Sequence, residues 1–367
     1  MECEQSAVEG LGLNPNFWRG KRVFVTGSTG FKGAWLCYWL HSAGADVRGF
    51  ALAPEGNPNL YKALALEELV ANDIDDVRDR EAVGKALLAS RCDVVFHLAA
   101  QPLVRASYDD PLYTYSVNVM GTANVLEAAR HNDALRAIVC VTTDKCYENR
   151  EWVWPYRESD ALGGRDPYSS SKACAEIVAS AYSRSFFSGD SSPGLATARG
   201  GNVIGGGDWS VDRIVPDMVR AFRSGVPAEI RNPDAVRPWQ FVLDALDGYL
   251  TLAERLYERP REYSQAWNFG PTSEYRVGTI ADRFRDAWGN GARWVAVSRE
   301  DFRKEAALLK LDSSKARSRL GWTDRFATPE AIEELAGWYT GYYGGTGARE
   351  LTQRAIDRFA ALATERR

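Results

Sequence analysis

The segment T-G-S-T-G-F-K-G, Thr26 to Gly33, follows the short apolar run 22–26 and leads into a second apolar segment, 31–42. Three glycines in the spacing G-x-x-G-x-x-G let a backbone turn tightly and approach a pyrophosphate, which then lies at the N-terminus of the next helix. Glycines also form ordinary turns, so the motif is informative because it lies between a first strand and a first helix. The segment predicts a dinucleotide-binding α/β domain, with these candidate cofactor-binding residues: Gly27, Thr29, Gly30, Phe31, Lys32 and Gly33.

The residues that hold the adenosine half of such a cofactor are less clear. An acid that binds the ribose is expected about 20 residues after the loop, and only Glu55, which follows a proline, is near that position. The choice between NAD and NADP therefore stays open. Asp76 and Val77, after a third strand region, are candidate contacts to the adenine edge, with an ordinary surface turn as the alternative.

The wider pattern extends this fold class along the chain. Short apolar runs alternate with helical periodicity in the first half, which is typical of a parallel sheet with crossover helices. The expected strands are 22–26, 47–52, 93–99, 137–142, 195–199 and 266–269, and the expected helices are 31–42, 80–89, 118–130, 168–187, 213–224, 242–257, 277–288 and 348–366. The segment 200–208 is too rich in glycine to predict regular structure.

We therefore predict a Rossmann-type, doubly wound parallel sheet with a smaller mixed α/β substrate domain. Residues 1–202 are expected to form the dinucleotide-binding domain, with return segments near 238–270. Residues 203–237 and 271–340 are expected to form the substrate domain, followed by a C-terminal helical tail at 341–367 with a flexible break at 341–347.

Composition excludes several classes of function. The 367 residues are 45% hydrophobic and 26% charged with a net charge of −4, which is typical of a soluble globular protein without a basic surface for nucleic acid or anionic membrane. No apolar run approaches the roughly 18 residues of a membrane span, and the N-terminus does not resemble a signal peptide. Six cysteines without a C-x-x-C pair and three histidines favour a cytoplasmic protein with neither a disulfide framework nor a metal site.

A tyrosine and a lysine suggest the chemistry. In D-P-Y-S-S-S-K, Asp166 is a helix N-cap and Pro167 the first helical residue, so Tyr168 and Lys172 share one helix face. A cation beside a phenol lowers the phenol pKa from about 10 toward neutrality. Tyr168 would then accept a hydroxyl proton while a hydride leaves the same carbon.

An acid and a base stand side by side at the end of the fourth expected strand. V-T-T-D-K-C-Y, Val141 to Tyr147, places Asp144 directly before Lys145. A solvated loop corner is the ordinary explanation for such a pair. Because Tyr168 and Lys172 start the next helix of the same domain, the pair also fits a second proton-transfer step in an active site.

Five long motifs together resemble one family. D-P-Y-S-S-S-K-A-C-A-E, V-T-T-D-K-C-Y-E-N-R-E-W-V-W, H-L-A-A-Q-P-L-V-R, G-N-V-I-G-G-G-D-W and I-R-N-P-D-A-V-R-P-W resemble the CDP-D-glucose 4,6-dehydratases, nucleotide-sugar dehydratases of the extended short-chain dehydrogenase/reductase class. The likeness runs from about Phe17 to Trp338. It implies NAD as cofactor, CDP-glucose as substrate, a homodimer or homotetramer packed through the helices that flank the active site, and a role in making deoxysugars of bacterial surface polysaccharide such as the O-antigen of lipopolysaccharide.

The resemblance also implies roles for residues. Tyr168, supported by Lys172, takes the C4 hydroxyl proton, and Thr143 binds the same oxygen. Asp144, in its protonated form, gives a proton to the departing C6 hydroxyl. Lys145 removes the C5 proton, for which it must be neutral through burial and neighbouring positive charge. A Glu stands at this position in the related dTDP-sugar dehydratases, so the lysine marks the CDP group.

Further contacts are implied at both ends of the site. The H-L-A-A segment places Leu98, Ala99 and Ala100 near the cofactor. Asn202 and Arg237 match positions that bind the substrate diphosphate. Weaker candidates for the same role are Arg213, Arg231 and Asn268, for which surface ion pairing or helix capping is the alternative.

Ser28, Phe241 and Pro155 depart from the usual family pattern, where His, His and Gly are common. The first departure concerns the affinity for the cofactor, and the second concerns contacts to the nucleotide or adenosine. None of the three touches the expected catalytic set.

Two other functions fit parts of the same pattern. A nucleotide-sugar epimerase or decarboxylase would share the glycine loop and the Tyr168/Lys172 pair without needing Asp144 and Lys145. A non-catalytic dinucleotide sensor would not need to keep Tyr168, Thr143 and Lys172 together. The dehydratase interpretation uses all of these residues.

Overall fold

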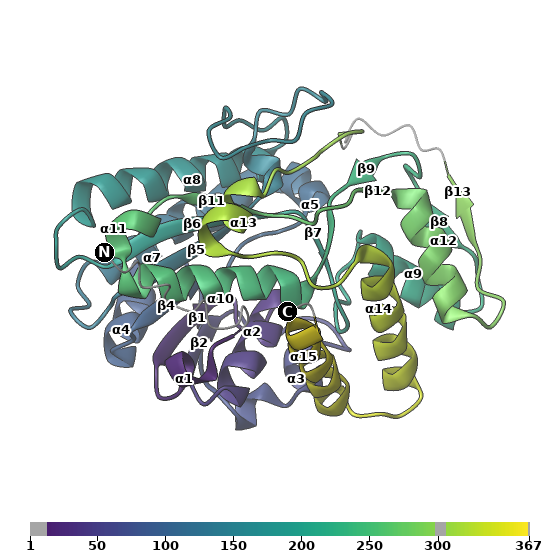
Figure 1. Cartoon of the computed structure of the whole chain (residues 1–367), viewed down its shortest axis with the longest axis horizontal. Helices are drawn as coiled ribbons and strands as arrows, with labels where there is room; N and C mark the ends of the chain where they lie inside the picture. The colour runs from purple at the N-terminus through teal and green to yellow at the C-terminus, as the bar shows by residue number, and fades with distance from the viewer. Residues whose placement is uncertain (1–12, 298–305, 366–367) are drawn as a thin grey trace, which may run out of the picture.

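The computed structural model describes residues 13–297 and 306–365. Its centre is a seven-stranded, all-parallel sheet with the strand order β11-β6-β5-β4-β1-β2-β3 (Figure 1). The strands are β1 (Arg22–Thr26), β2 (Asp46–Ala51), β3 (Ala71–Ile74), β4 (Val94–His97), β5 (Ala137–Thr143), β6 (Gly194–Gly200) and β11 (Ala266–Phe269). The predicted Rossmann-type fold class is confirmed.

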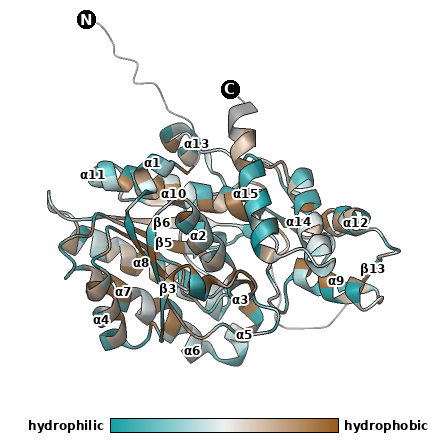
Figure 2. Ribbon diagram, turned by 90° about the horizontal axis from the view of Figure 1, so that it is seen from below, coloured by the Kyte–Doolittle hydropathy of each residue, from teal (hydrophilic) through white to brown (hydrophobic). Residues whose placement is uncertain are grey.

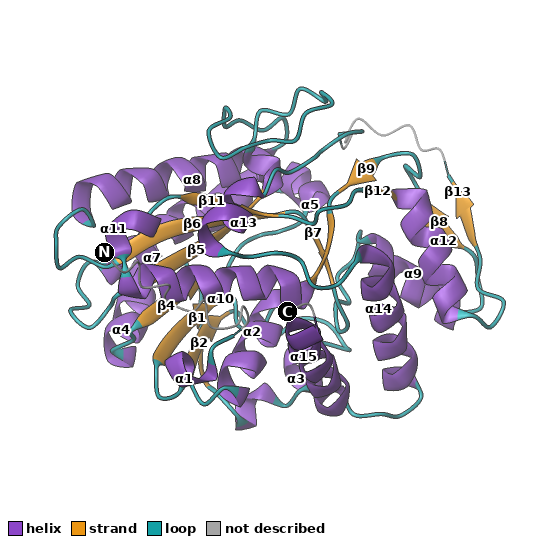
Figure 3. Cartoon of the chain, viewed as in Figure 1, coloured by secondary structure: helices purple, strands orange, loops and turns teal. Residues whose placement is uncertain are grey.

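Helices cover both faces of this sheet, as Figure 3 shows. One face packs against α2 (Phe31–Ser42) and α10 (Val242–Glu258), and the other against α4 (Arg80–Ser90), α7 (Gly121–Ala129) and α8 (Pro167–Phe186). All residues of β4, β5 and β6 are buried, because strands covered on both sides have no solvent face. The hydrophobic residues of Figure 2 accordingly gather on the central strands and the helix faces turned to them.

A smaller group of elements lies beyond one side of the sheet (Figure 1). It contains α9 (Ile214–Arg223), α12 (Val277–Trp288) and three two-stranded pairings, β8 (Ala228–Ile230) with β13 (Trp294–Ala296), β9 (Val236–Arg237) with β12 (Tyr275–Arg276), and β7 (Asn202–Ile204) with β10 (Trp239–Phe241). The remaining helices are α1 (Pro15–Trp18), α3 (Leu60–Ala63), α5 (Val104–Asp109), α6 (Pro111–Tyr115), α11 (Pro260–Tyr263), α13 (Ser314–Leu320), α14 (Thr328–Tyr343) and α15 (Ala348–Glu365). The division of the chain into domains given above stays a prediction.

Several predicted boundaries agree closely with the structure, and others need correction. The helices 31–42 and 277–288 and the strands 22–26 and 266–269 have the expected bounds. The single helix expected at 118–130 is instead a π-helical turn at Ser116–Met120 followed by α7. Asn118 explains the irregular turn, because its side-chain amide donates to the Gln101 carbonyl at 3.1 Å and to Ser171 Oγ at 2.8 Å.

The expectation that 200–208 lacks regular structure is wrong in its first half. β6 runs to Gly200, and β7 follows at Asn202–Ile204, paired with β10. The glycines beyond β7 lie in a segment without helix or strand, and they allow close packing. A Cβ on Gly206 would lie 2.1 Å from the Trp338 ring. Gly341, expected in a flexible break, belongs to α14.

The glycine loop after β1 is held by backbone contacts that leave no room for side chains. Gly27 has φ +72°, and a Cβ there would lie 2.8 Å from the Ala99 nitrogen, just after β4. A Cβ on Gly33 would lie 2.0 Å from the Gly27 carbonyl oxygen. Thr26 Oγ1 accepts from the backbone nitrogens of Leu98 and Ala99, each at 3.2 Å, so the ends of β1 and β4 are tied together.

None of the described helices is both long enough and apolar enough to cross a membrane. Of the six cysteines, Cys3 lies outside the described residues. Cys37, Cys92, Cys140 and Cys146 are buried free thiols, and Cys174 is a partly exposed one, as expected for small hydrophobic residues.

Gly33→Ala should destabilise the protein by about 1–3 kcal/mol, because the added methyl group meets rigid backbone that cannot move aside. Gly84→Ala is the matched control, since Gly84 lies inside α4 with nothing within 4 Å of an added Cβ. That control should stabilise the chain by up to about 1 kcal/mol, because Ala favours helix more than Gly does. Urea unfolding of both variants measures the difference, and equal effects would contradict the packing argument.

Candidate active site

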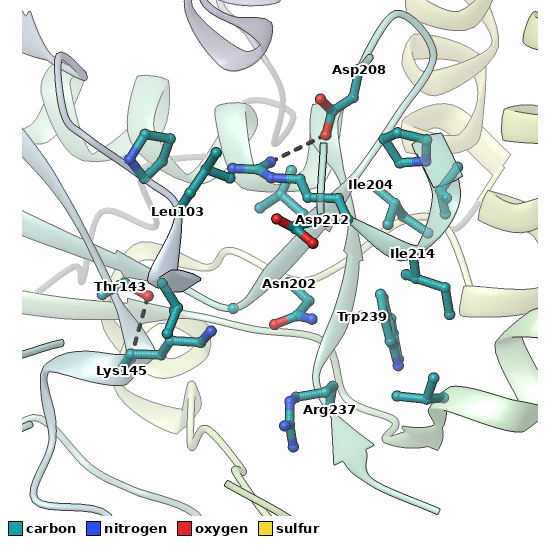
Figure 4. A pocket seen from close by; sticks show the side chains of 18 of the residues that line it. Leu103, Thr143, Lys145, Asn202, Ile204, Asp208, Asp212, Ile214, Arg237 and Trp239 are labelled. Carbon is teal, nitrogen blue, oxygen red and sulfur yellow. Dashed lines mark hydrogen bonds and ion pairs between the residues drawn. The ribbon is translucent and has the colours of Figure 1, made fainter. Parts of the chain in front are cut away.

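A cleft of about 870 Å³ opens between the sheet and the smaller group of elements. Its sheet side consists of the last residues of β5 and β6, the turn after β5, and the start of α2 and α8. Its other side comes from β7, the segment before α9, and the segments that follow β8 and precede β10 (Figure 4). Clefts outside the carboxyl ends of the strands are where open α/β sheets bind ligands.

The expected catalytic residues come together at this cleft. Thr143, Asp144, Lys145 and Tyr168 line it. Asp166 caps α8 by accepting from the Ser169 nitrogen at 2.8 Å, which sets the first turn that carries Tyr168. Lys172 follows one turn later and donates from Nζ to the Val141 carbonyl at 3.4 Å, so it lies behind the catalytic strand end.

The expected lowering of the Tyr168 pKa is wrong. The phenol is only 8% exposed, and burial raises its pKa to about 12, against a smaller opposing effect of the hydrogen bond from Thr143. Burial also lowers the pKa of Lys172 to about 8. Lys172 follows Tyr168 by one turn of α8, as the spacing predicts. The prediction left out desolvation, which is the largest influence on the pKa of both groups.

Asp144 has the environment of a neutral acid. Its side chain is 1% exposed, Oδ1 accepts from Thr143 Oγ1 at 3.0 Å, and Oδ2 is buried with no hydrogen-bond partner among the described residues. Burial raises the pKa of Asp144, and the nearby Lys145 opposes that rise. Lys145 itself is half-buried and points into the cleft (Figure 4), with its backbone nitrogen donating to Thr143 Oγ1 at 3.3 Å.

Lys32, the last residue of the loop motif before Gly33, brings a basic side chain to the cleft. It lines the cleft from the first turn of α2, with Nζ 5.8 Å from the centre of the Tyr249 ring. Burial, together with the smaller effect of the positive charges of Lys172 and Arg213, lowers its pKa to about 7. A neutral form of Lys32 is therefore accessible near physiological pH.

The loop around α2 fits a bound pyrophosphate. Gly30, the N-cap residue, offers no side-chain acceptor, so the first amides of α2 stay available, and Phe31 and Lys32 reach the cleft. The glycines at 27 and 33 cannot carry a Cβ. Uncapped amides at a helix N-terminus, reached through a tight glycine-containing turn, are what a dinucleotide phosphate requires.

The other expected cofactor residues lie around this loop. Thr29 Oγ1 donates to the Leu52 carbonyl at 2.9 Å at the end of β2, and Ala100 follows Ala99 beyond β4. Asp76 accepts from Arg78 at 2.6 Å, which lowers the pKa of Asp76. Val77 is buried, with its carbonyl accepting from Asn124 Nδ2 at 2.9 Å.

The departures at Ser28 and Phe241 are packing features in this protein. Ser28 is buried and donates from Oγ to Asn72 Oδ1 at 2.5 Å, which connects the loop to β3. Phe241 is 2% exposed and packs on Phe326 with 4.8 Å between ring centres, away from the cleft.

Arginines expected to hold a diphosphate occupy the far part of the cleft, with internal partners. Arg213 binds Asp208 at 3.1 Å and Arg231 approaches Asp212 at 3.4 Å. Arg237 lines the cleft and donates to the Ala306 and Ala307 carbonyls, the latter at 3.3 Å. Asn202 faces the same space from β7.

Asn268 is not brought to the cleft. It is fully buried on β11, and its amide donates to the carbonyls of Tyr156 and Asp312 while its oxygen accepts from Tyr147. Arg105, in contrast, lines the cleft from α5 and lies 3.8 Å from Asp212. The sequence could have indicated Arg105, because this residue ends the motif H-L-A-A-Q-P-L-V-R, which starts at the last residue of β4. The carboxyl ends of parallel strands meet at one edge of the sheet, where the cleft lies.

The fold and this set of residues define a short-chain dehydrogenase/reductase of the extended, nucleotide-sugar-modifying class. Residues 24–335 match the model of a family described as GDP-mannose 4,6 dehydratase, and the chain belongs to this family. It is 45% identical over 358 residues to a CDP-glucose 4,6-dehydratase of Salmonella typhimurium, covering 96% of this chain and 99% of that protein. It is 25% identical over 337 residues to a dTDP-glucose 4,6-dehydratase of Xanthomonas campestris, covering 86% and 92%.

Solved structures share the fold. A UDP-glucose 4-epimerase from Thermotoga maritima superposes with a TM-score of 0.77 at 20% identity, covering 88% of this chain and 99% of that chain. A dTDP-glucose 4,6-dehydratase from Streptomyces venezuelae, solved with NAD and TYD bound, gives a TM-score of 0.75 at 23% identity, covering 89% and 98%.

Asp144→Asn should stabilise the protein by about 0.5–2 kcal/mol at neutral pH, because it removes the cost of ionising a buried carboxyl while keeping its hydrogen bond from Thr143. A raised pKa means that the folded state binds the proton more tightly than the unfolded state, so stability is lost as pH rises through the folded pKa. The gain should therefore be absent below the ordinary Asp value of 3.8 and grow as pH rises above it. Unfolding titrations across this range measure the gain, and one independent of pH would contradict the assignment.

Proposed function

We propose that the chain converts CDP-D-glucose to CDP-4-dehydro-6-deoxy-D-glucose with NAD as a recycled cofactor, as a hydro-lyase. The observation that carries this proposal is that Asp144, Lys145 and Tyr168 line one cleft, with Lys172 behind it on α8. An oxidation at one sugar carbon needs only the second pair. The first pair supplies the acid and the base that elimination of water needs at the next two carbons.

When bound at the loop of α2, NAD⁺ accepts the hydride from sugar C4 and later returns it to C6. Tyr168 takes the C4 hydroxyl proton in the first step, and Thr143 hydrogen-bonds the same oxygen. Because burial disfavours the phenolate of Tyr168, its formation depends on the positive charge of Lys172 one turn away. With a pKa of about 8, Lys172 is mostly charged at neutral pH.

Elimination uses the other pair. A ketone at C4 acidifies the C5 proton, which passes to the amine of Lys145 as the C5–C6 double bond forms. Asp144, whose protonated form is favoured by burial, gives its proton to the C6 hydroxyl, which leaves as water. Lys145 returns its proton to C5 when C6 receives the hydride, so the base is restored.

The diphosphate of the substrate is bound by four residues whose donors face the far part of the cleft, namely Arg213, Arg231, Arg237 and Asn202. The identity with the Salmonella typhimurium relative supports cytosine as the nucleobase. Asn268 is left out of this set, because its side chain is fully used within the protein.

Three wider features belong to the same proposal. The product feeds deoxysugar synthesis for surface polysaccharide such as the O-antigen of lipopolysaccharide, and the enzyme acts in the cytoplasm, in keeping with its free cysteines. It assembles as a homodimer or homotetramer through the helices beside the active site. Support for assembly comes from exposed apolar side chains on these helices, namely Leu112, Met120, Ile177 and Phe186.

Incubation with NAD⁺ and CDP-glucose, followed by mass and NMR analysis of the sugar, tests the reaction. A product lighter by one water with a C4 ketone supports the dehydratase. An epimer that retains its C6 hydroxyl would instead indicate an epimerase, for which the family's solved relatives give precedent. No product from any nucleotide-glucose would favour a dinucleotide-binding protein without catalysis.

Lys145→Ala should permit C4 oxidation and stall elimination, because it removes the C5 base and leaves Tyr168 and Thr143 in place. The loss of overall turnover should be about 100- to 10,000-fold, the range for a general base. Reduced nicotinamide should therefore accumulate on the variant after one addition of substrate. Full dehydration at the normal rate would rule out Lys145 as the base.

A further inference from the structure

A buried ion pair lies directly behind the active site and has no part in the proposed chemistry. Arg199 on β6 and Glu176 on α8 are 4% and 3% exposed and approach to 2.7 Å. Glu176 follows Lys172 by one helical turn, and Arg199 is next to the end of β6. Buried pairs of this kind often add no stability over a well-packed apolar pair, so their use points to geometric specification.

Glu176 ties the catalytic helix to the catalytic strand. One of its oxygens accepts from Thr142 Oγ1, the residue before Thr143 on β5, and the other accepts from Thr197 Oγ1 at 2.8 Å on β6. The carboxylate therefore joins α8, β5 and β6 at one point. This point lies one turn from Lys172 and next to the residue that hydrogen-bonds the substrate oxygen in the proposed reaction.

Arg199 continues the connection to the far end of the catalytic turn. Its Nη1 donates to the Tyr147 hydroxyl at 2.8 Å, and its guanidinium lies 5.0 Å from the centre of the Tyr147 ring. The Tyr147 hydroxyl in turn donates to Asn268 Oδ1 at 2.6 Å. Tyr147 follows the single turn Asp144–Cys146, so this turn is fixed before its start through Thr142 and after its end through Tyr147.

We propose that Glu176, Arg199 and Tyr147 form a buried positioning chain that holds Asp144 and Lys145 in register with Tyr168 and Lys172. The inference rests on the proposed dehydratase function and deepens it. Oxidation at C4 relies on Tyr168, Lys172 and Thr143, which sit on a long helix and at a strand end. Elimination relies on Asp144 and Lys145, which sit on a three-residue turn. Because this short turn is held by the positioning chain, breaking the positioning chain should slow elimination before it slows oxidation. The same chain gives the buried Asn268 a role away from substrate.

Tyr147→Phe is the mildest test. It removes only the hydroxyl, while the ring keeps its stacking on Tyr156, at 5.2 Å between centres. In a single turnover with NAD⁺ and CDP-glucose, reduced nicotinamide should appear at the wild-type rate. Its decay should slow by up to about 100-fold, the loss that a misplacement of about 1 Å produces.

Arg199→Lys extends the test, because an ammonium cannot bond Glu176 and Tyr147 with a planar fork. Arg199→Lys should slow the decay of reduced nicotinamide in the same way. The double variant, Tyr147→Phe with Arg199→Lys, should slow this decay by less than the product of the two single effects, because both changes break the same positioning chain. Asp247→Asn is the matched control. Asp247 pairs with Arg325 at 3.1 Å, both nearly buried, and neither lines the cleft. The control should lower the melting temperature and leave the transient unchanged.

Two results would overturn the positioning chain. Equal slowing of the appearance and decay of reduced nicotinamide in Tyr147→Phe would indicate general damage to the site, and an unchanged decay would indicate no coupling. Failure of the dehydratase proposal itself is distinct, because the wild-type protein would then give no 4-keto-6-deoxy sugar.

Discussion

The close approach of two backbones, at Gly27 after β1 and Ala99 after β4, is the constraint on which the site depends. β1 and β4 are neighbours in the sheet, with β2 and β3 on one side and β5, β6 and β11 on the other. Chain connections leave in opposite directions from this point, so a crevice opens between them. Only residues without side chains at positions 27 and 33 let the turn bring the N-terminus of α2 to that crevice.

Desolvation then sets the protonation states that the crevice offers. Asp144 is driven toward its neutral form, and Lys32 and Lys172 toward lower pKa values, by the same burial. In the proposed reaction, Asp144 thereby serves as the proton donor, and Lys172 supplies positive charge from the next helical turn after Tyr168. Burial also disfavours the phenolate form of Tyr168, so in the proposed reaction the phenol depends on that positive charge before it can act as a base.

Sequence reasoning succeeded where local rules set the structure. The cap at Asp166 and the spacing from Tyr168 to Lys172 follow helix geometry, and the turn after β1 follows backbone sterics. It failed where long-range packing decides. Asn268 looked like a substrate contact, yet its position on an internal strand surrounds it with Tyr147, Tyr156 and Asp312. The Tyr168 pKa was misjudged because burial depends on elements that approach from elsewhere in the chain.

The acids of the cleft balance part of its positive charge. Asp208 and Asp212 pair with Arg213 and Arg231. Both arginines are about one-third exposed, so each pair contributes only about 0–1 kcal/mol, and its loss costs little. A diphosphate offers more oxygens in the geometry that guanidinium groups prefer. If Arg213 and Arg231 bind the substrate diphosphate as proposed, substrate binding is an exchange of anions, in which a weak internal partner is replaced by a stronger external one.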